Sequence, residues 1–197
     1  MERLKYEIPS LDRKQDAIDF INEFYEYNSE IYGVGGLNRY LDNYEDWLKK
    51  LENDYTMIPN GQRVPARTYF LVRESDNKIV GMSNLRLSLT EWLLENGGHI
   101  GYCIRPTERR KGYNKINLYL SLLEAKKHEL DNVLLTASDN NLGSVKTVEA
   151  LGGILENKIP DYEDETVLMG RYWINVDESI EKYKNLYEQY IVKEKVR

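Results

Sequence analysis

The stretch Ile104-Arg-Pro-Thr-Glu-Arg-Arg-Lys-Gly-Tyr-Asn114 decides the fold and holds the most informative chemistry of the chain. It follows an apolar run that predicts a strand over 99–105, and it leads into apolar positions at helical spacing that predict a helix over 112–129. Four cations and one acid stand in it: Arg105, Arg109, Arg110, Lys111 and Glu108. The unpaired N–H groups and the dipole of a helix N-terminus favour anions, and Gly112 lets a bulky ligand approach the backbone. These residues indicate a phosphate or pyrophosphate site, with a solvated basic turn as the alternative.

Two common phosphate-binding motifs are excluded at this turn. The Gly-x4-Gly-Lys-Ser/Thr pattern of a Walker A loop is absent. A dinucleotide fingerprint needs three glycines after the strand, and Gly112 stands alone. The turn therefore belongs to another class of phosphate site.

Composition narrows the class of protein further. The 197 residues carry a net charge of −6, so we expect no general binding to nucleic acid or to an anionic membrane. A single cysteine, Cys103, excludes an intrachain disulfide, and with only His99 and His128 a zinc cage is not expected. The first residues lack the apolar core of a signal peptide and no run is long enough to span a membrane, which predicts a cytoplasmic protein.

The remaining pattern predicts a mixed order of strands and helices. Strands are expected at 3–8, 68–73, 78–87, 99–105, 133–137, 154–159 and 166–174. Helices are expected at 10–27, 43–54, 90–96, 112–129, 141–151 and 177–195. This order favours an α/β or α+β fold, a sheet with helices on both faces.

The basic turn and a second motif together resemble one family. Arg109-Arg-Lys-Gly112-Tyr-Asn114 is similar to the Arg/Gln-x-x-Gly-x-Gly/Ala motif of the GNAT superfamily of acetyl-CoA-dependent N-acetyltransferases. The family also carries Asn-x-x-Ala/Ser on its last core helix, followed by a glycine eleven residues after the Asn. Asn141-Leu-Gly-Ser144 and Gly152 match that spacing. The whole stretch from Gly97 to Ile159 resembles this family, and Gly97-Gly-His-Ile-Gly-Tyr102 with Arg109-Arg-Lys-Gly-Tyr113 is most similar to a bacterial subgroup of predicted acetyltransferases.

The resemblance implies a fold, a co-substrate and a set of binding residues. The implied fold is a mixed, mostly antiparallel central sheet of about six to seven strands with helices on both faces. The implied co-substrate is acetyl-CoA, with no metal required. The residues expected to bind it are Ile104, Arg105, Arg109, Arg110, Lys111, Gly112, Tyr113, Asn114, Asn141 and Ser144.

Two positions depart from the family pattern. Asn114 replaces the last small residue of the first motif, so its side chain either crowds a pyrophosphate or donates to it. Val148 stands where many members place a tyrosine general acid. Deprotonating an amine of pKa about 10.4 at pH 7 costs roughly 4.6 kcal/mol, and expelling a thiolate unprotonated costs only about 2 kcal/mol. The base matters more than the acid, so loss of the tyrosine is tolerable.

His99 is the candidate base, because its strand runs beside the acetyl group in this family and an imidazole titrates near neutral pH. A structural histidine that holds a backbone group is the alternative. Four further acids stay open as bases: Glu74, Glu91, Glu95 and Asp139. The glycine loop at 33–37, with tyrosines 25, 27, 32 and 40, falls where the family builds its acceptor mouth. A mobile loop suits gating, and an ordinary helix connection is equally consistent.

The sequence thus predicts an enzyme that transfers the acetyl group of acetyl-CoA to a primary amine by direct attack on the thioester. The alternatives are a CoA-binding or sensor module with weakened catalysis and a non-enzymatic interaction protein. Polyamine, aminoglycoside, amino acid, peptide N-terminus and protein lysine all remain open as acceptors. We expect one acetyltransferase domain over 1–176 and an amphipathic C-terminal helix over 177–197, packed on that domain or at a homodimer interface.

Overall fold

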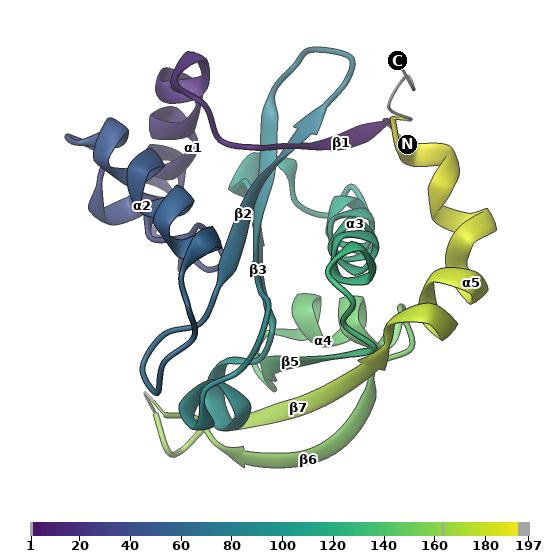
Figure 1. Cartoon of the computed structure of the whole chain (residues 1–197). Helices are drawn as coiled ribbons and strands as arrows, with labels where there is room; N and C mark the ends of the chain where they lie inside the picture. The colour runs from purple at the N-terminus through teal and green to yellow at the C-terminus, as the bar shows by residue number, and fades with distance from the viewer. Residues whose placement is uncertain (1, 163, 193–197) are drawn as a thin grey trace.

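The computed structural model describes residues 2–162 and 164–192 (Figure 1). The end of the predicted C-terminal segment, 193–197, lies outside the described residues. Within the described residues, the helices are all too short or too polar to cross a membrane.

In the described part of the chain, seven strands form two antiparallel sheets. The first sheet has the order β1-β2-β3-β4 and the second the order β5-β7-β6. The first sheet contains β1 (Leu4–Glu7), β2 (Ala66–Arg73), β3 (Ile79–Arg86) and β4 (Ile100–Ile104). The second contains β5 (Asn132–Ser138), β6 (Ile154–Pro160) and β7 (Leu168–Asn175).

The helices cover both faces of the first sheet (Figure 1). On one side lie α1 (Lys14–Glu26) and α2 (Tyr44–Thr56). On the other side lies α3 (Tyr113–Lys127). The helix α4 (Leu142–Glu149) packs on β5 and α3, and α5 (Val176–Tyr187) packs on α3 and β7. Short turns of 3-10 helix lie at Leu11–Arg13, Leu37–Arg39, Pro106–Glu108 and Glu188–Tyr190, and a π-helical segment at Leu93–Gly97. The predicted fold class is confirmed.

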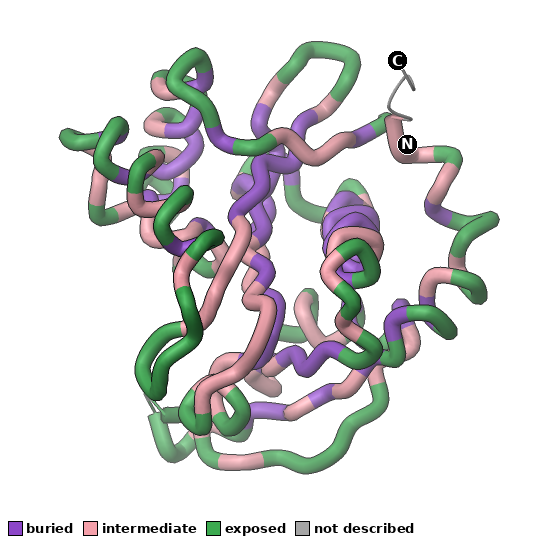
Figure 2. The backbone as a smooth tube through the Cα atoms, in the orientation of Figure 1, coloured by how far each residue is buried: buried purple, intermediate pink, exposed green. Residues whose placement is uncertain are grey.

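The alternation of side chains along β2 explains why the sheet is covered twice. Phe70 and Val72 pack with α1 and α2, whereas Tyr69 and Leu71 pack with α3, and all four are buried. A strand that buries both faces reads as a continuous apolar run, as this one does. Figure 2 shows the resulting buried centre along β2, β3 and α3.

The C-terminal helix packs on its own chain. The Asn175 side chain accepts a hydrogen bond from Glu178 N and so caps α5 at its start. Tyr187 contacts the ring of Tyr119 on α3 at a centroid distance of 5.4 Å, and Ser179 donates to the carbonyl of Leu151. Ile180, Tyr183 and Tyr190 are partly buried against the core cluster that contains Tyr119, so α5 packs on its own chain in the described structure.

Candidate functional site

The strands β4 and β5 are joined at one end and are unpaired with each other beyond it. They meet where His99 N donates to the Leu134 carbonyl at 2.7 Å and Leu134 N donates to His99 Nδ1 at 2.9 Å. Beyond that contact they belong to different sheets. We call this contact the pivot, and we call the facing, unpaired edges of the two strands the opening.

The edges of this opening carry main-chain groups without ladder partners. Arg86 N donates to the His99 carbonyl and Arg105 N to the Val80 carbonyl, so the odd-numbered residues of β4 pair with β3. By alternation, the main-chain groups of Tyr102 face β5. Asp139 N bonds to the Leu168 carbonyl in the ladder with β7, so those of Thr136 face β4 in the same way. An extended chain with amide groups could hydrogen-bond to both edges. The sequence did not show which main-chain edge of each strand is left without a hydrogen-bonded neighbour.

The His99 side chain is bound into the pivot. It is 7% exposed, and its ring packs edge-on against Trp173. Burial, assisted by the charge of Arg86, lowers its pKa from 6.5 to about 4. Because Nδ1 accepts the Leu134 N–H, the neutral ring carries its proton on Nε2 and has no free lone pair. This geometry favours the structural alternative, so the base role predicted from the sequence is not part of our proposal.

The start of α3 provides an uncapped helix N-terminus beside the opening. Gly112 precedes the helix with φ of 80°, a conformation that a residue with Cβ adopts only at a cost. No side chain caps the helix at this end. Arg110 also lies in the left-handed region, at φ of 62°. An uncapped helix start next to two left-handed residues leaves main-chain N–H groups that an anion could accept from.

Three of the four predicted cations are already engaged within the chain. Arg105 Nη1 lies 3.1 Å from Glu23 Oε2 in an ion pair that is nearly buried. Arg109 donates to Ser29 Oγ at 2.7 Å and to the Ile104 carbonyl at 3.2 Å. The exposed Arg110 has no ion pair or hydrogen bond to any described residue. The turn is thus less positive than its sequence suggests. Arg110 is the cation of this turn that remains available to bind an anionic ligand.

Lys111 belongs to a network around the buried carboxylate of Glu108. Glu108 accepts hydrogen bonds from Arg73, Lys78 and Lys111. Burial alone would raise the pKa of this carboxyl, but these three cations outweigh it and lower the value to about 2. Arg73 also donates to the hydroxyl of Tyr113 at 3.3 Å, so that side chain points into the core. Tyr113 offers only its main chain to a ligand.

The second predicted motif lies across the opening from the first. The Asn141 side chain caps α4 by accepting from Ser144 N at 3.1 Å, and Ser144 Oγ lies 2.9 Å from the Tyr102 hydroxyl. Asn114 Nδ2 donates to Thr147 Oγ1 at 3.2 Å, while its Oδ1 is buried without a partner. The Asn114 side chain thus turns toward α4. Tyr102, which the sequence did not single out, links β4 to the second motif through Ser144.

Val148 stands where many family members have a tyrosine, and its side chain is part of the core. Val148 is fully buried, and a Cβ on Gly153 would lie 2.4 Å from its Cγ1. No hydroxyl is available at this position.

The four other acids named as bases are either paired with a cation or exposed. Glu74 pairs with Arg3, Asp139 pairs with Lys158, and Glu91 and Glu95 are exposed.

The glycine loop after α1 lies directly on β4. A Cβ on Gly33 would lie 2.3 Å from main-chain atoms of Gly101 and Tyr102. The loop is also held by Trp47 and Lys50, which both donate to the Gly35 carbonyl. These contacts favour a fixed cover over β4 rather than the mobile gate that the glycines suggested.

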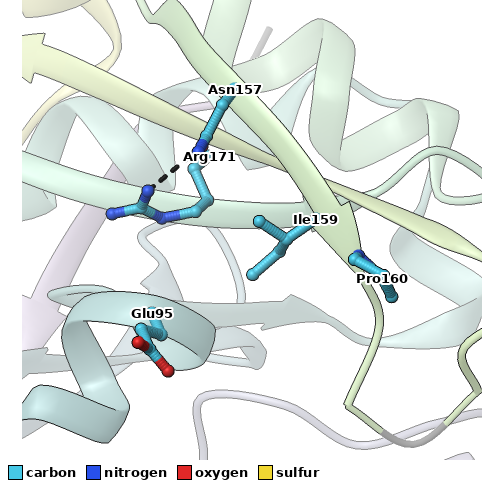
Figure 3. Close-up of a pocket in the computed structure, with 5 residues that line it drawn as sticks. All are labelled: Glu95, Asn157, Ile159, Pro160 and Arg171. Atoms are coloured by element: carbon cyan, nitrogen blue, oxygen red, sulfur yellow. Dashed lines mark hydrogen bonds between the residues drawn. The ribbon is translucent and has the colours of Figure 1, made fainter.

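A surface cavity of about 400 Å³ opens on the second sheet (Figure 3). It is lined by Glu95, Asn157, Ile159, Pro160 and Arg171. The lining comes from the π-helical segment before β4 and from the β6–β7 ribbon, so sequence spacing gave no sign of it. Among the described residues, no group of three or more His, Cys, Asp or Glu side chains is placed to hold a metal ion.

Comparison with known proteins assigns the fold. The acetyltransferase (GNAT) family model matches residues 21–152, and the chain belongs to that family. No curated protein matches the chain in sequence. Spermidine N-acetyltransferase from Vibrio cholerae, solved in complex with CoA and spermine, is 13% identical with a TM-score of 0.63, over 90% of this chain and 98% of that chain. A dodecameric structure of spermidine N-acetyltransferase from Vibrio cholerae in an intermediate state is 12% identical with a TM-score of 0.64, over 91% of this chain and 98% of that one.

Proposed function

We propose that the chain is an N-acetyltransferase that binds acetyl-CoA in the opening between β4 and β5. The observation that carries the proposal is a pair of unpaired strand edges next to the uncapped start of α3. The pyrophosphate would lie at the N–H groups of residues 110–114, with the Arg110 side chain beside it. The amide-bearing arm of the co-substrate would pair with the free main-chain groups of Tyr102 and Thr136. Asn114, Asn141 and Ser144 would line the floor.

The reaction we propose is direct attack of a primary amine on the bound thioester. The amine nitrogen forms a bond to the carbonyl carbon, the carbon–sulfur bond breaks, and the thiolate leaves with the electron pair. The amine proton passes to solvent, because the nearest imidazole donates rather than accepts at Nε2. The roughly 4.6 kcal/mol needed to deprotonate the amine at pH 7 predicts faster turnover at higher pH.

The acceptor is an amine of a small molecule or a peptide. The net charge of −6 favours a cationic acceptor. The structural neighbours named as spermidine acetyltransferases place polyamines first in an acceptor panel. A cytoplasmic location, a bacterial source and assembly into homodimers remain part of the proposal.

The test is acetyl-CoA consumption over a panel of polyamines, aminoglycosides, amino acids and lysine peptides, together with thermal shift on adding CoA. The proposal predicts a CoA-dependent rise in melting temperature and turnover with at least one amine. Stabilisation by CoA with no turnover on any amine would support the second candidate, a CoA-binding sensor. The buried Val148, which supplies no acid, is the observation that favours that candidate. No thermal shift with CoA would contradict both and favour an interaction protein.

A further inference from the structure

The cavity on the second sheet has an uncompensated negative charge. The Glu95 carboxylate is exposed and has no ion pair or hydrogen bond to any described residue. The other charged lining group, Arg171, is already neutralised. Its Nη1 lies 2.8 Å from Glu156 Oε2 and donates to Asn157 Oδ1, and its Nη2 donates to the Leu94 carbonyl.

Two exposed aromatic residues flank the segments that line this cavity. Trp92 lies one helical turn before Glu95 on the same segment, and Tyr162 follows Pro160 at the end of β6. Their rings meet edge to face at a centroid distance of 5.7 Å. Trp92 is 51% and Tyr162 68% exposed, which is unusual for side chains of this size. Aromatic faces attract cations, so the rings and the carboxylate favour the same kind of ligand.

The cavity lies within reach of the opening between β4 and β5. Asn157 on β6 pairs with Arg171 on β7, and Arg171 pairs with Thr136 on β5. Asn157, Arg171 and Thr136 therefore form one row of paired residues across β6, β7 and β5, and Thr136 lies at the edge of the opening. With neighbouring strands about 4.8 Å apart, the row places the cavity about 10 Å from that edge.

We propose that this cavity binds a second, non-reacting cationic group of an extended acceptor. The reacting amine lies at the opening, and a positive charge about 10 Å away lies at the Glu95 carboxylate, in the cavity whose lining segments are flanked by Trp92 and Tyr162. The acceptor class is a linear amine with two or more positive charges. This inference rests on the proposed function, because it assigns the far end of the acceptor for that reaction.

Three amines distinguish the effect of a second positive charge in the acceptor from the effect of its chain length. Diaminooctane carries a second charge at the required distance, octylamine has the same length without it, and diaminoethane has a second charge too close to reach. Their kcat/KM values are compared in wild type, Glu95→Gln and Glu181→Gln. Glu181 is exposed on α5, away from the cavity, so its variant matches the change in net charge. Calorimetry of diaminooctane binding, with and without CoA, tests the site independently of turnover.

We expect Glu95→Gln to lower kcat/KM for diaminooctane about three- to tenfold through KM, and to weaken its binding in calorimetry by the same factor. Octylamine, diaminoethane and CoA affinity should not change, and Glu181→Gln should behave as wild type. An unchanged KM and affinity for diaminooctane in Glu95→Gln would overturn the inference, as would an equal loss with octylamine. If no amine is acetylated, the proposed function fails. Loss of calorimetric diaminooctane binding in Glu95→Gln would still support the cavity as a cation site.

Discussion

Replacing His99 by Ala tests whether the imidazole holds the sheets together or takes a proton. The substitution removes the acceptor of the Leu134 N–H, and an unsatisfied buried donor costs about 1–3 kcal/mol. It also removes the ring that packs against Trp173, and the lost packing adds about 2 kcal/mol. We expect a loss of about 3–5 kcal/mol in the free energy of unfolding, measured by urea denaturation at pH 7. For a domain of this size the melting temperature should fall by about 6–20 °C.

The pH dependence of stability gives a second readout. The pKa of His99 is about 4 in the folded protein and near 6.5 when unfolded, so between these values the unfolded state binds more protons. Stability from this group is complete above pH 6.5 and is lost as pH falls toward 4, by about 3 kcal/mol. This part of the pH dependence should disappear in His99→Ala. His99→Asn keeps an acceptor for Leu134 N without titrating, so it should be more stable than the Ala variant and equally free of that dependence.

The same variants test the base role predicted from the sequence. A base role would make His99→Ala lose about 10²- to 10⁴-fold in kcat/KM and remove the rising limb of the pH profile. If His99→Ala unfolds at the wild-type urea concentration while its turnover falls by that factor, our assignment of His99 to a structural role is wrong.

Three further substitutions address the site and its support. Gly112→Asp adds bulk and negative charge at the start of α3, so CoA binding measured by calorimetry should be abolished; unchanged affinity would place the pyrophosphate elsewhere. Val148→Tyr forces a ring into a fully buried position beside Gly153 and should cost about 1–3 kcal/mol in urea denaturation. Higher turnover without lost stability would instead mean that the ring reaches the leaving thiolate. Truncation after Asn175 removes α5 and uncovers Tyr119, so the protein should melt at a lower temperature and be less soluble. An unchanged melting temperature would show that α5 contributes nothing to stability.

Local features of the sequence predicted the fold and the elements that carry the candidate site. The strand, turn and helix from 99 to 129 are set by neighbouring residues, and β4 and α3 form there as expected. The helix expected over 141–151 likewise forms as α4, and Asn141 caps it, a contact that acts within one helical turn.

Contacts between distant residues limited the rest of the prediction. His99 and Leu134 are 35 positions apart, and no local pattern shows that the side chain of one accepts the N–H of the other. Arg105 is neutralised by Glu23, which lies 82 positions away, so counting charges in the turn overstated its positive charge. The close contact of Gly33 in the glycine loop with Gly101 on β4 could not be predicted either, because it also joins residues far apart in the sequence.

The central claim is that acetyl-CoA lies between β4 and β5 with its pyrophosphate at the start of α3. Residue-resolved amide hydrogen exchange, measured by NMR with and without CoA, tests it most directly. We predict slower exchange at Tyr102, Ile104 and Thr136 and at the amides of 110–114, and unchanged exchange along β6. Saturating CoA binding that leaves those amides unprotected, or that protects another surface, would contradict the account.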